Sequence, residues 1–118
     1  MRYMLLIYMT EDAMSQTERE QCYVKSAQLA QQLHSNGKLL TTAPLQPVSM
    51  TISVQMRAGN RLVTDGPFAE TREQLGGFFL IEAKDLDEAI GVAAQIPGAR
   101  VGTVEIRPVI ELAGLPKR

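Results

Sequence analysis

The sequence is poor in the residues from which disulfides and metal sites are built. Its 118 residues contain no tryptophan and one histidine, and Cys22 is the single cysteine. One cysteine excludes an intrachain disulfide, which favours a reducing compartment, with the cytoplasm as the expected location. One histidine and one cysteine cannot supply any familiar metal-ligand spacing. We therefore expect neither a metal ion nor another cofactor.

An excess of charge and long hydrophobic runs are missing as well. With 12 basic and 13 acidic residues the formal net charge is −1, and Lys117-Arg118 is the only adjacent basic pair, so nothing favours a nucleic-acid partner. The apolar stretch at residues 3–9 is too short to span a bilayer, so no membrane partner is expected. It also lacks the basic start and the cleavage pattern of a signal peptide. A chain of this length predicts a single domain over residues 1–118.

The spacing of apolar residues predicts two helices and several strands. Ser15 and Glu18 fit a capping box at the start of a helix that runs to about residue 35, and Gly37 suits the left-handed position after its end. Asp85 is the predicted N-cap of a second helix that ends at residue 96. The predicted strands cover residues 2–9, 39–43, 50–56, 61–64, 77–83 and 103–109.

Each amphipathic segment has a face that we expect to be buried. In the first helix this face holds Cys22, Tyr23, Ala27, Leu29, Ala30 and Leu33. In the second helix it holds Leu86, Ala89, Ile90, Ala93 and Ile96. In the segment at residues 50–56 it holds Met50, Ile52, Val54 and Met56, which alternate with polar residues on a wet face.

The order of these elements predicts the fold. Apart from an inserted β-hairpin at residues 50–64, the order is βαββαβ, which is the ferredoxin-like α+β arrangement. In that topology the first and third main strands are central and both helices cover one face of the sheet, so the other face should be wet. In this sequence both central strands are apolar on both faces. Because monomers rarely expose so large an apolar patch, we expect a homodimer in which two sheets pack face to face.

Four segments carry a family resemblance. They are residues 64–78 (TDGPFAETREQLGGF), 1–8 (MRYMLLIY), 82–89 (EAKDLDEA) and 104–109 (VEIRPV). On these residues the chain resembles the YCII-related proteins, in the branch named for its DGPF motif, over nearly its whole length. The resemblance implies a ferredoxin-like fold with an inserted β-hairpin that pairs into a dimeric α/β barrel. It also implies a link to extracytoplasmic-function sigma factors, beside which many members of this branch are encoded.

The resemblance also points to a position on the first helix. The wider YCII group is thought to use a His-Asp pair whose histidine lies on that helix. Residues 21–29 contain no histidine here, and Ser26 lies nearest to the matching position. The chain therefore departs from the group's pattern at the residue that would carry the chemistry.

The DGPF motif holds the main candidate site residues. Asp65 fits two roles: its carboxylate caps a backbone amide in the turn, or it acts as a general acid or base in a cleft between sheet and hairpin. Glu73 is the second candidate catalytic carboxylate, because it directly precedes a strand that is apolar on both faces. Phe68, Gly66 and Arg107 are the candidate ligand-binding residues. Glu70 and Arg72 are expected in a solvated turn.

Two functions remain open at this stage. The first is a cofactor-independent small-molecule enzyme of the isomerase, lyase or dehalogenase type, with its site in the barrel cleft. The second is a non-catalytic accessory protein that binds a ligand or a partner such as a sigma factor. A pocket that holds two carboxylates would favour the enzyme, whereas an Asp65 that only supports its turn would favour the accessory protein.

Overall fold

The computed structural model describes residues 1–69 and 71–116 and has the expected α+β composition. Glu70 and the pair Lys117-Arg118, for which we made predictions above, lie outside the described residues. The elements in chain order are β1 (Arg2–Met9), α1 (Gln16–Ser35), β2 (Leu39–Pro44), η1 (Val48–Met50), β3 (Ile52–Arg57), β4 (Asn60–Asp65), β5 (Gln74–Glu82), α2 (Leu86–Gln95), η2 (Pro97–Arg100) and β6 (Thr103–Pro108).

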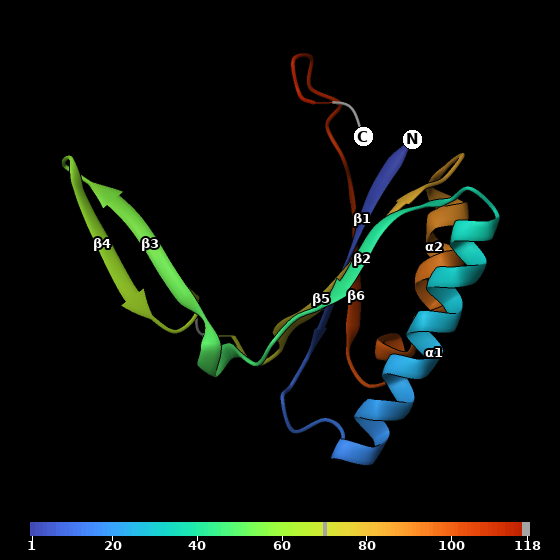
Figure 1. Ribbon diagram of the computed structural model, residues 1–118, viewed down its shortest axis with the longest axis horizontal. Helices are drawn as coiled ribbons and strands as arrows, with labels where there is room; N and C mark the ends of the chain where they lie inside the picture. The colour runs from blue at the N-terminus through green and yellow to red at the C-terminus, as the bar shows by residue number, and fades with distance from the viewer. Residues whose placement is uncertain (70, 117–118) are drawn as a thin grey trace.

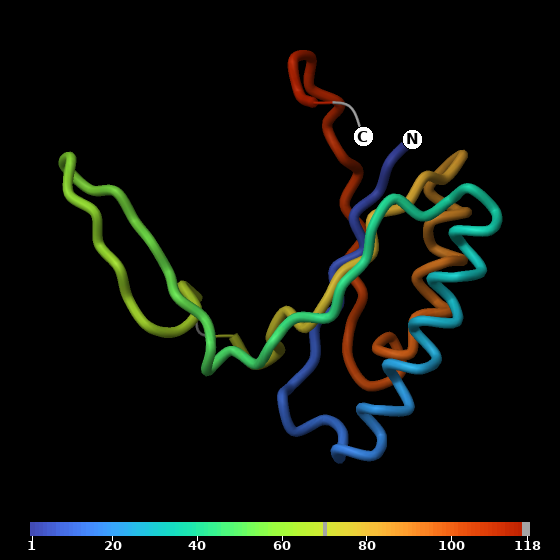
Figure 2. Tube along the Cα trace, in the orientation of Figure 1, coloured from blue at the N-terminus to red at the C-terminus, as the bar shows by residue number. Residues whose placement is uncertain are grey.

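Four of the strands form one antiparallel sheet in the order β2-β5-β1-β6. The central strands are therefore β1 and β5, as predicted, and the order is consistent with a ferredoxin-like fold. Figure 1 shows α1 and α2 on the same side of this sheet, while the β3–β4 hairpin projects away on the other side. Residues 109–116, which follow β6, leave the sheet at the end where the chain begins (Figure 2), and there the Val109 amide donates to the Arg2 carbonyl over 2.9 Å.

The core lies between the sheet and the two helices. Tyr3 pairs with Ile81 and Leu5 with Phe79 across the two central strands, and all four side chains are buried. The helices and the turn after α2 complete this core with Leu29, Leu33, Ala89, Val92, Ala93 and Ile96. The two buried residues of α1, Leu29 and Leu33, both lie in its C-terminal half.

The second face of the sheet is also apolar, and no described helix or strand covers it. Met4 pairs with Leu80 and Leu6 with Phe78, and these side chains are half-buried by one another rather than by a second layer. On the edge strand β6, this face carries Glu105 and Arg107, whose carboxylate and guanidinium lie 3.3 Å apart. We refer to this surface as the open sheet face.

Side-chain caps fix the starts of both helices, as the sequence predicts. The Ser15 hydroxyl accepts from the Glu18 amide, and Glu18 Oε1 accepts from the Ser15 amide. The hydrogen bond from the Ser15 backbone is the main reason why the pKa of Glu18 is lowered. The Asp85 side chain accepts from the Glu88 amide over 2.9 Å. A carboxyl whose pKa is lowered on folding stabilises the protein at neutral pH, and this contribution is lost as the pH falls through that lowered pKa.

The prediction of a buried apolar face on the hairpin is wrong for the protomer. Met50, Ile52, Val54 and Met56 are 58–66% exposed, and Val63, which pairs with Val54, is 58% exposed. The hairpin is amphipathic, as its alternation indicates, but it stands apart from the sheet (Figure 1). This projection helps to explain a radius of gyration of 16.0 Å, where a compact chain of this length has about 13.5 Å.

Four of the predicted helix core residues are also exposed. They are Tyr23 and Ala27 on α1 and Leu86 and Ile90 on α2. A helical wheel gives the width of an apolar stripe, whereas the tilt of the helix on the sheet decides which edge of the stripe is covered. In α1 the two exposed residues line the pocket described below.

We predict that Gly102→Ala destabilises the protein by about 2 kcal/mol or more. A Cβ at Gly102 would collide with the Tyr8 carbonyl oxygen and would lie 2.8 Å from Met9 Cβ, so β6 could not approach β1 as closely. The matched control is Gly91→Ala within α2, where a Cβ meets nothing within 4 Å and alanine should stabilise by about 0.5–1 kcal/mol. Urea unfolding of both variants measures the difference. An unchanged midpoint for Gly102→Ala would contradict the packing described here.

Candidate functional site

The first predicted site residue, Asp65, ends β4 and points to solvent. Its carboxylate forms no hydrogen bond with another described residue, so the predicted capping bond to a nearby amide is absent there. The turn is held instead by Gly66, whose amide donates to the Thr51 carbonyl over 2.7 Å and whose carbonyl accepts from Ser53 Oγ over 2.7 Å. Gly66 has a φ of +97°, a conformation that glycine adopts without strain.

The other predicted site residues lie in separate places. Phe68 is 78% exposed. Glu73 is half-buried, and its Oε1 accepts from Thr103 Oγ1 over 3.0 Å at the start of β6. Arg107 lies on the open sheet face beside Glu105. Within one protomer the structure therefore does not bring the five predicted residues together into one cluster.

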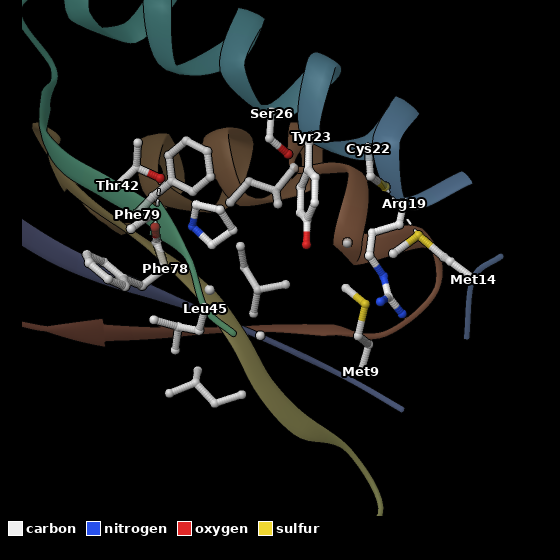
Figure 3. Close-up of a pocket in the computed structure, with 18 of the residues that line it drawn as sticks. Met9, Met14, Arg19, Cys22, Tyr23, Ser26, Thr42, Leu45, Phe78 and Phe79 are labelled. Atoms are coloured by element: carbon white, nitrogen blue, oxygen red, sulfur yellow. Dashed lines mark hydrogen bonds between the residues drawn. The ribbon is translucent and has the colours of Figure 1, made fainter. Parts of the chain in front are cut away.

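A pocket of about 1030 Å³ lies elsewhere, between residues 19–31 of α1 and the neighbouring parts of β1, β2 and β5. Its walls are mainly apolar and include Ile7, Met9, Leu45, Phe79 and Ile96. It is open to solvent on one side, and Figure 3 shows side chains from α1 facing those of the strands across it. Apolar concavities with a few polar groups are the usual form of small-molecule sites.

The polar groups of this pocket come largely from one face of α1. Arg19, Tyr23 and Ser26 are spaced by four and three residues, so they follow one another along that face. In Figure 3 all three side chains leave the helix on the side that faces Met9 and Leu45. The hydroxyls of Tyr23 and Ser26 form no hydrogen bond with another described residue, so both are free to contact a bound molecule.

Arg19 is held in place by a single hydrogen bond. Its Nη2 donates to the Glu11 carbonyl oxygen over 2.9 Å, which fixes the side chain against the connection between β1 and α1. No described carboxylate forms an ion pair with it. Glu11 also lines the pocket, and its carboxylate accepts from the Val48 amide over 3.0 Å.

Sulfur atoms gather at the same end of the pocket. Cys22 Sγ lies 3.4 Å from Met14 Sδ, and Figure 3 shows Met9 on the facing strand. Cys22 is half-buried, in keeping with the predicted packing role. Thioethers are polarizable and adapt to the shape of an apolar ligand. Among the described residues, no three histidine, cysteine, aspartate or glutamate side chains come together as metal ligands.

Sequence reasoning missed this pocket as a site. The spacing of Arg19, Tyr23 and Ser26 is visible in the sequence, but Tyr23 was assigned to the core, and Arg19 and Ser26 gave no motif. The resemblance supplied the one useful signal, because it placed Ser26 at the helix position where the wider group carries its histidine. Ser26 does line the pocket.

The structure defines the class as an α+β protein, consistent with a ferredoxin-like fold, with a mainly apolar pocket beside its first helix. The chain belongs to the YCII-related family, since the sequence model of the YCII-related domain matches residues 1–113. It is 37% identical over 114 residues to an uncharacterized protein from Rhizobium meliloti (strain 1021), and the match covers 92% of each chain. In the described part of the chain, no helix is long and apolar enough to cross a membrane.

We predict that Asp65→Asn changes the free energy of unfolding by less than about 0.5 kcal/mol. The carboxylate is exposed and holds no hydrogen bond to the described turn, which is fixed through Gly66 instead. Ser53→Ala, which removes the hydroxyl that donates to the Gly66 carbonyl, is the comparison variant and should cost about 1 kcal/mol. Thermal unfolding of both variants checks this. A larger loss of stability for Asp65→Asn than for Ser53→Ala would show that the Asp65 carboxylate stabilises the turn.

Proposed function

We propose that this protein is a homodimer that binds a small, mainly apolar molecule in the pocket beside α1. The observation that carries the proposal is the pocket itself, about 1030 Å³ in volume, with apolar walls and three polar side chains from one helix face. This volume is sufficient for a ligand of drug-like size. The binding function needs no metal ion and no acid-base pair.

The homodimer part of the proposal is supported by the uncovered apolar surfaces. The open sheet face presents Met4, Leu6, Phe78 and Leu80 without a second layer. The apolar face of the hairpin, with Ile52, Val54 and Met56, is also exposed to water in the single protomer. A second copy with the same sheet face is self-complementary, and two-fold pairing of such faces would form a dimeric α/β barrel.

A catalytic function would require reactive groups in the pocket in addition to ligand binding. Asp65 and Glu73 do not line the pocket in one protomer, so an acid-base reaction that uses both needs an arrangement beyond the single chain. Glu11 also lines the pocket, and its carboxylate already accepts a hydrogen bond from the Val48 amide. We therefore favour the binding function. Four expectations from the sequence stay predictions. They are catalysis by Asp65 and Glu73, ligand contacts by Gly66, Phe68 and Arg107, a single domain over residues 1–118, and an association with a sigma factor.

The dimer can be tested by placing a charge on the open sheet face. We predict that Met4→Glu raises the dissociation constant of the dimer at least about tenfold, because two buried carboxylates would enter the interface. The variant should still fold, since Met4 is only half-buried in the monomer and lies on the open sheet face, outside the core. The matched control is Val24→Glu, which adds the same charge at an exposed apolar residue of α1.

Sedimentation equilibrium of the wild type and both variants measures this effect, with circular dichroism as the check on folding. A folded Met4→Glu protein that dimerises as tightly as the wild type would contradict the proposed interface. Dissociation by Val24→Glu instead would place the interface on the helical side.

The pocket can be tested by filling it. We predict that Ala27→Phe weakens binding of the neutral apolar dye N-phenyl-1-naphthylamine about fivefold or more, because Ala27 lines the pocket and the ring would occupy its volume. Gln32→Phe is the matched control, since it adds the same ring to an exposed position of α1 away from the pocket. Dye fluorescence titrations check both variants. Equal affinities for Ala27→Phe and the wild type would place the bound dye elsewhere.

A further inference from the structure

The pocket contains a cation that no described anion neutralises. Arg19 is half-buried, lines the pocket and forms no ion pair with a described residue. Only Nη2 is used internally, in the bond to the Glu11 carbonyl, so Nε and Nη1 keep their hydrogens for another acceptor. An arginine that is anchored but unpaired beside apolar walls is matched best by an anionic group on a ligand.

Glu11 does not neutralise the charge of Arg19. Glu11 lines the same pocket, and the charge of its carboxylate is opposite to that of Arg19. However, its Oε2 accepts from the Val48 amide over 3.0 Å, and no oxygen of it lies within ion-pair distance of Arg19. The backbone carbonyl of the same residue receives the Arg19 hydrogen bond, so Glu11 positions the guanidinium rather than neutralising it.

Tyr23 extends the polar end of the site. It lies one helical turn after Arg19, and in Figure 3 its hydroxyl points into the pocket on the same side as the Arg19 guanidinium. The hydroxyl has no hydrogen-bond partner among the described residues. A planar anion that accepts from the guanidinium could accept from this phenol at the same time, because a carboxylate has two oxygens with free lone pairs.

We propose that the ligand is a carboxylic acid with an apolar body, whose carboxylate binds Arg19 and Tyr23 and whose body lies against Met9, Leu45 and Phe79. This inference rests on the proposed binding function and adds the chemical class of the ligand. One guanidinium with one phenol matches a singly charged, planar carboxylate. A phosphate monoester has a higher charge and commonly needs more donors than this pocket supplies. The facing apolar walls explain why the rest of the ligand is not polar.

The test compares octanoate with octanamide, which share the same chain but differ in charge. We expect isothermal titration of the wild-type protein to show octanoate binding about five- to tenfold more tightly than octanamide. Arg19→Gln should remove this preference by weakening octanoate alone, and Tyr23→Phe should weaken octanoate by a smaller factor. Arg19→Lys should keep part of the preference, because it keeps the charge but loses the planar geometry. Lys25→Gln removes a cation from an exposed part of α1 that does not line this pocket and should change neither affinity.

The outcomes separate the ligand class from the binding function itself. Equal affinities for the acid and the amide in the wild type, together with no effect of Arg19→Gln, would overturn the carboxylate assignment and leave apolar binding intact. A loss with Lys25→Gln as large as that with Arg19→Gln would overturn it too, because net charge rather than the site would then explain the preference. If the wild type bound neither compound and also failed to bind the neutral dye, the proposed function would fall together with this inference.

Discussion

The pairing of β1 with β5 is the interaction on which the rest of the structure depends. Both strands are apolar on both faces, so the pair needs cover on two sides. Toward the helices, Tyr3, Leu5, Phe79 and Ile81 are fully covered and form the centre of the core. Toward the other side, Met4, Leu6, Phe78 and Leu80 have no second layer within the protomer. The same strand pair therefore organises the fold of one chain and provides the surface for its proposed assembly.

The site follows from the way α1 is divided. The helix has 20 residues, and its fully buried residues Leu29 and Leu33 lie in its second half. The pocket extends along residues 19–31 of the helix, where Arg19, Tyr23 and Ser26 face the strands without being packed into the core. The core residues and the residues that line the pocket are therefore different side chains of one helix. Substitutions of Arg19, Tyr23 and Ser26 should cause little loss of stability, because none of these three side chains is buried in the core.

The features set by local physics were predictable from the sequence, and those set by packing between surfaces were not. The caps at Ser15 and Asp85 and the two central strands follow from residue type and periodicity, and all are present. The hairpin shows the limit: alternation identified its apolar face, but it cannot tell whether the same chain or another molecule covers that face. The pocket shows a second limit, since the exposure of Tyr23 depends on how α1 lies over the sheet, which no helical wheel specifies.

Which of the two apolar surfaces receives the ligand is the central question, and NMR of the ¹⁵N-labelled wild-type protein with octanoate answers it directly. Our account predicts that the largest backbone shift changes occur around Arg19, Tyr23 and Ser26 and in the facing part of β1 near Met9. The amides of Met4, Leu6 and Leu80, which lie on the open sheet face, should change little because a second copy covers them. Changes concentrated at Met4, Leu6 and Leu80, with none along α1, would contradict both the assignment of the pocket and the proposed role of the open sheet face.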